Sequence, residues 1–277
     1  MSIDVLVKVA MLIGLFVSYN LWLHFFPITK TAFYDNIERT EEYLFSGKNY
    51  THVFVGSGLI GGFQNNALKH SFKLFFPYYG SCTGIEIIAL SQKIPDVLLV
   101  ETNYIFKGIN QELIEKVFAK HAELKRFLPF LLKKNQPLNL LKSLIKRVLG
   151  KNKERDADLG EKNEQALTMF INLYNELPNV DKFRSDIERL KSNIDLIVSR
   201  GCQVIFFESP MDPVLENASL FAFQRDVLKI VFSPGQFRWI APDLLEKYET
   251  EDGIHLTVGS SQKFAGYIVR QITENIV

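Results

Sequence analysis

Hydrophobic and polar residues follow two patterns along the chain, one typical of buried strands and one typical of amphipathic helices. Apolar runs without alternation predict four strands, at residues 51–56, 95–103, 202–210 and 237–245. Helical spacing predicts helices at residues 41–47, 84–94, 110–127, 164–177, 181–201 and 261–276. Strands that are apolar on both faces are typical of parallel sheets covered by helices on both sides. The pattern therefore predicts an α/β fold with an open, three-layer parallel sheet.

The N-terminal apolar segment, residues 9–26, has a different character. It contains no Asp, Glu, Lys or Arg, and it is long enough to cross a bilayer core of about 30 Å. We interpret it as a single-pass anchor; a cleaved signal peptide and a buried helix are the alternatives, although the bulky residues that follow do not resemble a cleavage site. Basic residues on both sides leave the orientation open. We expect an anchor over residues 1–30 and one domain over residues 31–277, with a helical insertion at 107–200.

Composition narrows the classes of function. The formal net charge is +1, which gives no overall attraction to nucleic acid, and 47% hydrophobic residues in 277 are enough for a full core. Cys82 and Cys202 fall near different predicted strands, so a disulfide between them is not expected, and two cysteines are too few for a metal site.

Polar residues at the ends of the predicted strands carry the candidate chemistry. The first strand ends in Gly56, Ser57 and Gly58, and the second in Glu101-Thr102-Asn103. Function in open α/β sheets gathers at the carboxyl ends of the strands. Nearer the C-terminus, Asp252 and His255 stand in a D-x-x-H spacing ahead of a helix. An imidazole held by a carboxylate is the general base that nucleophilic acyl transfer needs.

These stretches resemble the SGNH (GDSL-type) hydrolase superfamily over residues 50–275. "GSGLIGG" (56–62) stands at the family's first block, with Gly56 and Gly62 at its glycine positions. Gly80 resembles the second-block glycine, with Gly84 as the alternative, and Asn103 matches the third-block asparagine. "DGIHLT" (252–257) matches the last block. The resemblance implies an SGNH or flavodoxin-like sheet.

The resemblance also implies a chemistry. A serine would attack an ester carbonyl, His255 would take its proton, and Asp252 would orient the imidazole. The oxyanion would be met by the nucleophile's N–H, the N–H of Gly80 and the side-chain amide of Asn103. No metal or organic cofactor enters. Anchored branches of the family acylate or deacylate envelope polysaccharides, so an acylated glycan or acyl donor is the implied ligand and an extracytoplasmic domain the implied location.

The nucleophile position is where this chain departs from the family. When the glycines are aligned, Ser57 falls one place early and Gly58 falls where the family has its serine. Three explanations stay open: a naturally inactive member that binds glycan or a partner, an enzyme that uses Ser57 through a shifted turn, or an introduced substitution. The expected function is accordingly an esterase or O-acyltransferase, or a non-catalytic subunit of a membrane polysaccharide-acylation system.

Residues 125–153 form a basic segment within the predicted insertion, with many Lys and Arg and no Asp or Glu. A solvated helical hairpin, broken at Pro129 and Pro137, is one interpretation. An amphipathic surface on anionic lipid is the second. Docking to a membrane-embedded acyltransferase partner is the third.

Overall fold

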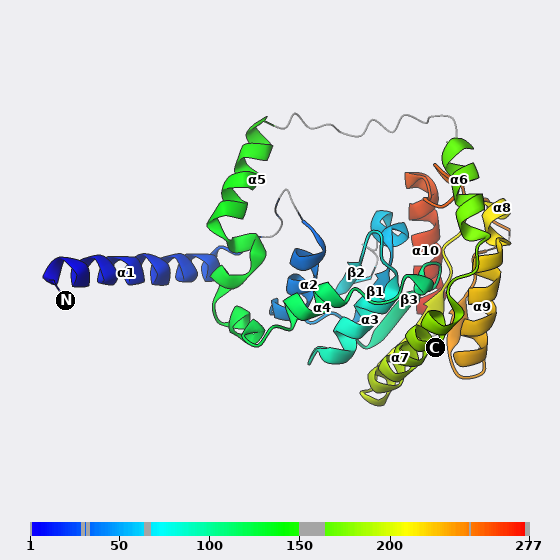
Figure 1. Cartoon of the computed structure of the whole chain (residues 1–277), viewed down its shortest axis with the longest axis horizontal. Helices are drawn as coiled ribbons and strands as arrows, with labels where there is room; N and C mark the ends of the chain where they lie inside the picture. Colours follow the sequence, from blue (N-terminus) through cyan, green and yellow to red (C-terminus); the bar gives the residue numbers. More distant parts are fainter. Residues whose placement is uncertain are drawn as a thin grey trace. The chain divides into compact units, whose positions relative to one another are not determined.

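The computed structural model describes residues 2–28, 31, 34–63, 68–149, 164–243 and 245–274. The chain divides into two compact units, one of Met1–Gly47 with Glu115–Asp156 and one of Lys48–Ile114 with Ala157–Val277 (Figure 1). Residues 36–47 and 115–149 therefore group with the N-terminal helix, which differs from a plain division into anchor and domain. We refer to these as the N-terminal unit and the sheet unit.

A five-stranded, all-parallel sheet forms the centre of the sheet unit, as the apolar runs predict. Its order is β2-β1-β3-β4-β5, with bounds β1 His52–Gly56, β2 Ser71–Phe75, β3 Val97–Glu101, β4 Gln203–Phe207 and β5 Arg238–Ile240. The direction of the strand order reverses between β1 and β3, which makes their carboxyl ends the natural place for a crevice. The edge strand β2 was not predicted, because its five residues alternate in burial and form no continuous apolar run.

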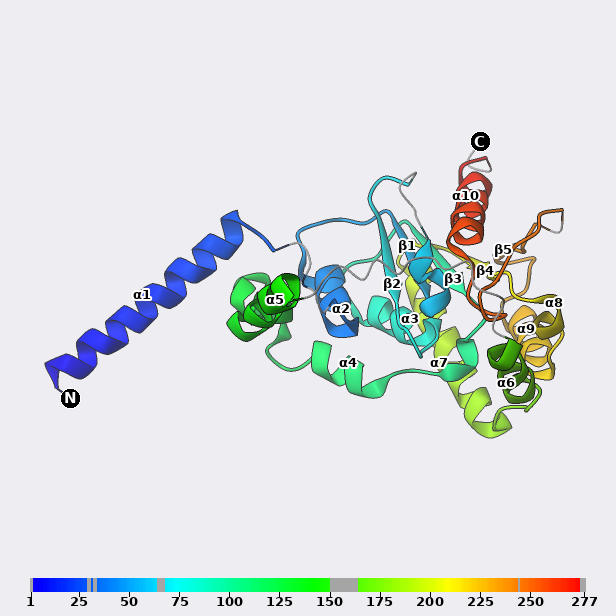
Figure 2. The same cartoon turned by 90° about the horizontal axis from the view of Figure 1, so that it is seen from above.

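Helices cover both faces of this sheet (Figures 1 and 2). The register aligns Phe54, Leu99 and Ile205 on one face, where they share a core with Phe264 and Ile268 of α10 (Val258–Glu274). On the other face lie α3 (Ser81–Leu90) and α7 (Val180–Ser199), which pack against each other, α3 also on β1 and α7 on β4. The three-layer arrangement follows from strands that are apolar on both sides.

The remaining helices that include residues of the sheet unit lie in the connections between its strands. They are η1 (Gly58–Gly62), η2 (Ile105–Lys107), α4 (Gln111–Val117), α6 (Glu164–Tyr174), α8 (Pro213–Glu216) and α9 (Ser219–Val231). Helix α9 was not predicted. The helix predicted over 110–127 is broken into α4 and the short η3 (Ala122–Arg126), with the Ala122 N–H donating to Ala119 across the break. Helix α7 falls inside the predicted insertion but serves as part of the layer that covers the sheet.

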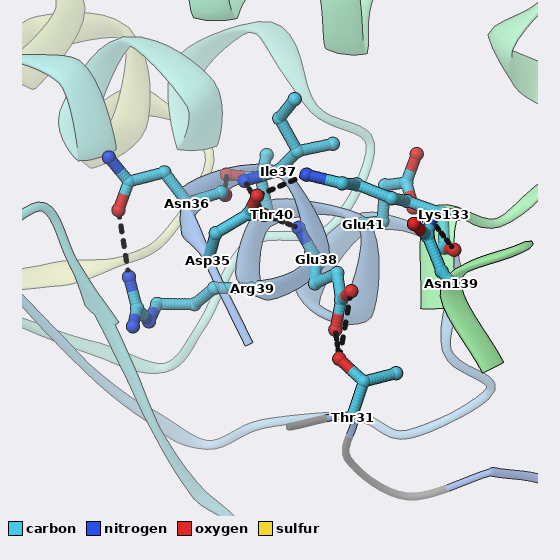
Figure 3. A network of polar contacts seen from close by, with 10 residues as sticks. All are labelled: Thr31, Asp35, Asn36, Ile37, Glu38, Arg39, Thr40, Glu41, Lys133 and Asn139. Atoms are coloured by element: carbon cyan, nitrogen blue, oxygen red, sulfur yellow. Dashed lines mark hydrogen bonds and ion pairs between the residues drawn. The ribbon is translucent and has the colours of Figure 1, made fainter. Parts of the chain in front are cut away.

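The N-terminal unit contains α1 (Ile3–Phe25), α2 (Asn36–Phe45), η3, η4 (Pro129–Leu131), η5 (Lys133–Asn135) and α5 (Pro137–Leu149). Among the described residues, α1 is the one helix long and apolar enough to cross a membrane. A signal sequence near the N-terminus meets the same criteria of length and apolar composition. Asp35 is the N-cap of α2, and its side chain accepts hydrogen bonds from the N–H groups of Ile37 and Glu38 (Figure 3).

Helix α3 approaches β1 so closely that Gly84 has no room for a side chain. A Cβ on Gly84 would lie 2.4 Å from Val55 Cγ1. Gly84→Ala should therefore destabilise the protein by about 1–3 kcal/mol, although alanine is the better helix former. Thermal unfolding of the full chain in detergent measures the effect.

Gly266 of α10 is the matched control, because the nearest atom to its built Cβ is Arg270 Nη1 at 4.0 Å. Gly266→Ala should leave the melting temperature unchanged or raise it. An equal response of the two variants would contradict the close packing of α3 on β1.

Candidate active site

The candidate site begins where β1 ends against the buried carboxylate of Glu101. A Cβ on Gly56 would lie 2.8 Å from Glu101 Cβ, so no larger residue fits. Glu101 is fully buried, and its Oε2 accepts a 2.7 Å hydrogen bond from the Ser57 N–H. Burial raises the pKa of Glu101, against the lowering effect of the hydrogen bonds from Ser57. Glu101 thus fixes the backbone turn that leads out of the strand.

The Ser57 hydroxyl serves this turn. Ser57 is only 4% exposed, and its Oγ accepts a 3.2 Å hydrogen bond from the Leu59 N–H as the cap of η1. A serine in this place stabilises the first turn of a helix. The structure therefore gives the Ser57 side chain a capping position.

Gly58 is the residue that faces the imidazole of His255. A Cβ built on Gly58 would lie 3.9 Å from His255 Nε2 and 3.8 Å from Pro77 Cα, which are ordinary van der Waals distances. A side-chain oxygen on that Cβ could come within hydrogen-bond reach of Nε2, which is the spacing a nucleophile and its base require. The structure thus has room for a serine at this position, but the chain carries a glycine there.

Asp252 holds His255 by its other ring nitrogen. Asp252 Oδ2 lies 2.7 Å from His255 Nδ1, and Oδ1 accepts from the backbone N–H of His255 at 2.8 Å. The hydrogen bond to Asp252 raises the pKa of His255 above its ordinary value, more than burial lowers it. Burial acts to raise the pKa of Asp252, but the bonds and charge of His255 lower it overall. The pairing leaves Nε2 directed toward Gly58.

An apolar cluster supports both sides of this contact. Leu59, which follows Gly58, and Ile254, which precedes His255, belong to one buried cluster with Tyr104 and Tyr174. The two tyrosine hydroxyls lie 2.7 Å apart, and burial raises the pKa of both.

Gly253, in the loop that carries Asp252 and His255, has a positive φ of 98°, and its carbonyl accepts a hydrogen bond from the Asp212 N–H at 2.8 Å. The loop that carries Asp252 and His255 is therefore anchored to the segment after β4.

Gly80 and Asn103 lie close together, because Gly80 packs against the backbone of Tyr104, the residue after Asn103. Gly80 caps α3, and a Cβ there would lie 1.9 Å from the Tyr104 carbonyl oxygen, so only glycine fits. Asn103 is buried, and its amide exchanges two hydrogen bonds with the Ser209 backbone, from Nδ2 to O at 2.9 Å and from N to Oδ1 at 2.7 Å. This pair ties the end of β3 to the segment after β4. The second N–H of Asn103 Nδ2 remains chemically able to donate.

An exposed aromatic residue, Tyr78, follows Pro77, whose Cα borders the Gly58 position. The Tyr79 N–H donates to the Phe76 carbonyl across a turn that places Tyr78 at φ 69°, a conformation that favours glycine. Tyr78 is 92% exposed. A bulky residue in the left-handed region costs about 1–3 kcal/mol. The chain carries this cost at the residue next to Pro77, which borders the Gly58 position.

The structure thus brings together Gly58, from near the start of the sheet unit's sequence, and Asp252 and His255, from near its end. It gives Ser57 a capping role, and it places Gly80, the cap of α3, against Tyr104, the residue after Asn103. Sequence reasoning noted Glu101 only as the end of a strand, and it missed Tyr78. "PYYG" (77–80) contained the signal for Tyr78, because a tyrosine follows proline at the turn position where glycine or asparagine is usual.

No family model matches the sequence, and a search of curated proteins finds no match either. Within the described residues, no group of three or more His, Cys, Asp or Glu is placed to hold a metal ion.

The Asp252–His255 pair predicts a titration order for two histidines. The hydrogen bond to Asp252 raises the pKa of His255, whereas burial lowers the pKa of His52. In ¹³C-histidine NMR spectra of the full chain, His255 should titrate above about 6.5 and His52 below it. Asp252→Asn should lower the His255 midpoint and leave His52 unchanged.

The pKa of His255 is raised in the folded state, so its pairing stabilises the fold below the unfolded-state pKa, and this contribution is lost as pH rises through the folded-state pKa. A His255 midpoint at or below that of an exposed histidine would contradict the pairing.

Proposed function

We propose that this chain is a membrane-anchored, SGNH-hydrolase-like protein whose site recognises acyl esters of an envelope glycan, and that Gly58 prevents it from forming a covalent acyl-enzyme. The observation that carries the proposal is the 3.9 Å distance between a Cβ built on Gly58 and His255 Nε2. The anchor is α1, with the length and composition of a membrane span. The extracytoplasmic side and the glycan rest on the resemblance alone.

The chemistry follows from what each group can do. Asp252 orients the imidazole and stabilises its protonated form, so that His255 Nε2 can accept a proton from a hydroxyl placed before it. In the chain as it stands that hydroxyl has to come from water or from a substrate. Without a side-chain oxygen at position 58, no ester bond to the enzyme forms there. Hydrolysis by general base alone would be slow.

A non-catalytic binding or assembly subunit is the second candidate. The observation that favours it is the Ser57 hydroxyl, which is buried and accepts from Leu59 N–H. A membrane-embedded acyltransferase would be the partner of such a subunit. The two candidates share the binding of an acylated glycan and differ in whether His255 moves a proton.

Restoring a hydroxyl at position 58 tests the proposed chemistry. Gly58→Ser should raise the hydrolysis of p-nitrophenyl acetate by at least about 10²-fold, because general-base catalysis alone contributes about 10²–10⁴-fold. The double variant Gly58→Ser/His255→Ala should lose the gain. Release of p-nitrophenol by the full chain in detergent is the measurement.

Ser57→Ala is the control for this experiment, since it removes the neighbouring hydroxyl. It should leave the low activity of the original chain unchanged. Strong activity of the original chain that Ser57→Ala abolishes would instead identify Ser57 as the nucleophile. If Gly58→Ser gains nothing while the fold is intact, the hydrolase-like interpretation fails and the binding subunit remains.

Tyr78 is the proposed contact for the sugar ring. Tyr78→Gly should raise the melting temperature, because it relieves a left-handed tyrosine, and should weaken binding of an O-acetylated hexose oligosaccharide at least about fivefold, or about 1 kcal/mol. Tyr78→Phe keeps the ring and should bind as the original chain does. Isothermal titration and thermal unfolding provide the two readings. Equal affinity of all three proteins would exclude Tyr78 from the ligand site.

A further inference from the structure

The C-terminal third of α1 carries two polar side chains that a membrane span has to satisfy. Asn20 is buried; its Nδ2 donates to the Phe16 carbonyl at 2.9 Å and its Oδ1 accepts from the Phe130 N–H at 3.1 Å. The Tyr19 hydroxyl donates to the Asn135 carbonyl at 2.7 Å. Polar groups within a membrane-spanning helix normally find partners in the protein. Here the partners outside α1, Phe130 and Asn135, belong to the segment at 129–135.

Aromatic contacts fix the same segment to α1. The Phe130 ring packs edge-on against Phe16 at 5.3 Å and against Tyr19 at 6.0 Å between centroids. With a rise of about 1.5 Å per residue, Asn20 lies about 8 Å along the axis from the C-terminal end of α1. If α1 spans a core of about 30 Å, residues 129–135 lie at the depth of the outer acyl chains or the glycerol region.

The backbone of this segment suits that depth, because its N–H groups find partners within the N-terminal unit. The N–H groups of Leu131, Leu132 and Asn135 donate to carbonyls three residues earlier. The Lys133 N–H donates to Glu41 Oε2 at 2.7 Å, and the Lys133 ammonium pairs with Asp35 (Figure 3). Irregular backbone at membrane depth is tolerated where the protein itself supplies such partners.

Helix α5 follows directly and is amphipathic. Leu138, Leu141, Leu144 and Ile145 are exposed, by 72%, 54%, 58% and 47%. Their spacing puts them on one arc of the helix, and Lys142 and Lys146 border one edge of that arc. An apolar arc bordered by lysines is the pattern of a helix that lies in the plane of a membrane interface.

We infer that residues 127–149 form a membrane-interface surface, seated beside α1, in which α5 lies on the leaflet where the C-terminal end of α1 emerges. The occupant is anionic lipid: the stretch from 125 to 153 contains no Asp or Glu, and lysines beside apolar residues attract acidic head groups. Phe127, which lies in the same basic stretch, is also 79% exposed. The surface would hold residues 127–149 against the bilayer, independently of any chemistry at Gly58.

Site-specific labelling of the full chain tests this inference. Leu141→Cys, labelled with an environment-sensitive fluorophore, is reconstituted into vesicles of phosphatidylcholine with or without phosphatidylglycerol. The native cysteines should stay unlabelled, because burial raises the pKa of both Cys82 and Cys202 to about 12. The label should emit as in an apolar medium and lose most of its fluorescence to a spin label near the head group.

Leu12→Cys, near the centre of α1, is the depth control. Its label should be quenched best by a spin label near the end of the acyl chain, the reverse of the order at position 141. Adding phosphatidylglycerol should increase quenching at position 141, and Lys142→Gln/Lys146→Gln should remove that increase. A label at position 141 that stays in water in both vesicle types, while position 12 is quenched, would overturn the inference and would assign the surface to a protein partner. Insensitivity to phosphatidylglycerol would overturn the choice of anionic lipid.

Discussion

The hydrogen bond from the Ser57 N–H to the buried Glu101 carboxylate is the interaction on which the rest of the candidate site depends. It joins the carboxyl ends of β1 and β3, the neighbouring strands at which the sheet order reverses. Glu101 can occupy this place only because residue 56 has no side chain, since a Cβ there would lie within 3 Å of Glu101. The turn that follows is held in one conformation, and this conformation decides which residue meets His255.

Two consequences follow from this fixed turn. The Ser57 side chain is turned to cap η1, and the backbone of Gly58 is turned to His255. A one-residue shift at the end of a strand reverses the direction of the side chain, so the two neighbouring positions cannot exchange roles without a change in the turn. The Asp252–His255 pair is therefore in place, and under the proposed function it would lack a side-chain hydroxyl to act on.

The sequence predicted the parts of the molecule that depend on local pattern. Continuous apolar runs such as 95–103 are buried strands of a parallel sheet, and the D-x-x-H spacing places Asp252 on the ring of His255. The edge strand β2 was not predicted, because three of its five residues are only partly buried. The role of Glu101 depends on a contact between distant segments, which residue patterns do not encode, whereas the turn at Tyr78 had a local signal in "PYYG". The packing of residues 129–135 on α1 is also long-range, since its hydrogen bonds join residues more than a hundred positions apart in the sequence.

Covalent trapping tests most directly whether Gly58 occupies the nucleophile position. A fluorophosphonate ester reacts with a serine hydroxyl that a neighbouring imidazole activates, and intact-mass spectrometry with peptide mapping locates the adduct. We predict that Gly58→Ser gains one adduct, on the peptide that contains position 58, that His255→Ala in that background prevents it, and that the original chain stays unmodified. An adduct on Ser57 of the original chain, or an unmodified Gly58→Ser protein, would contradict the account.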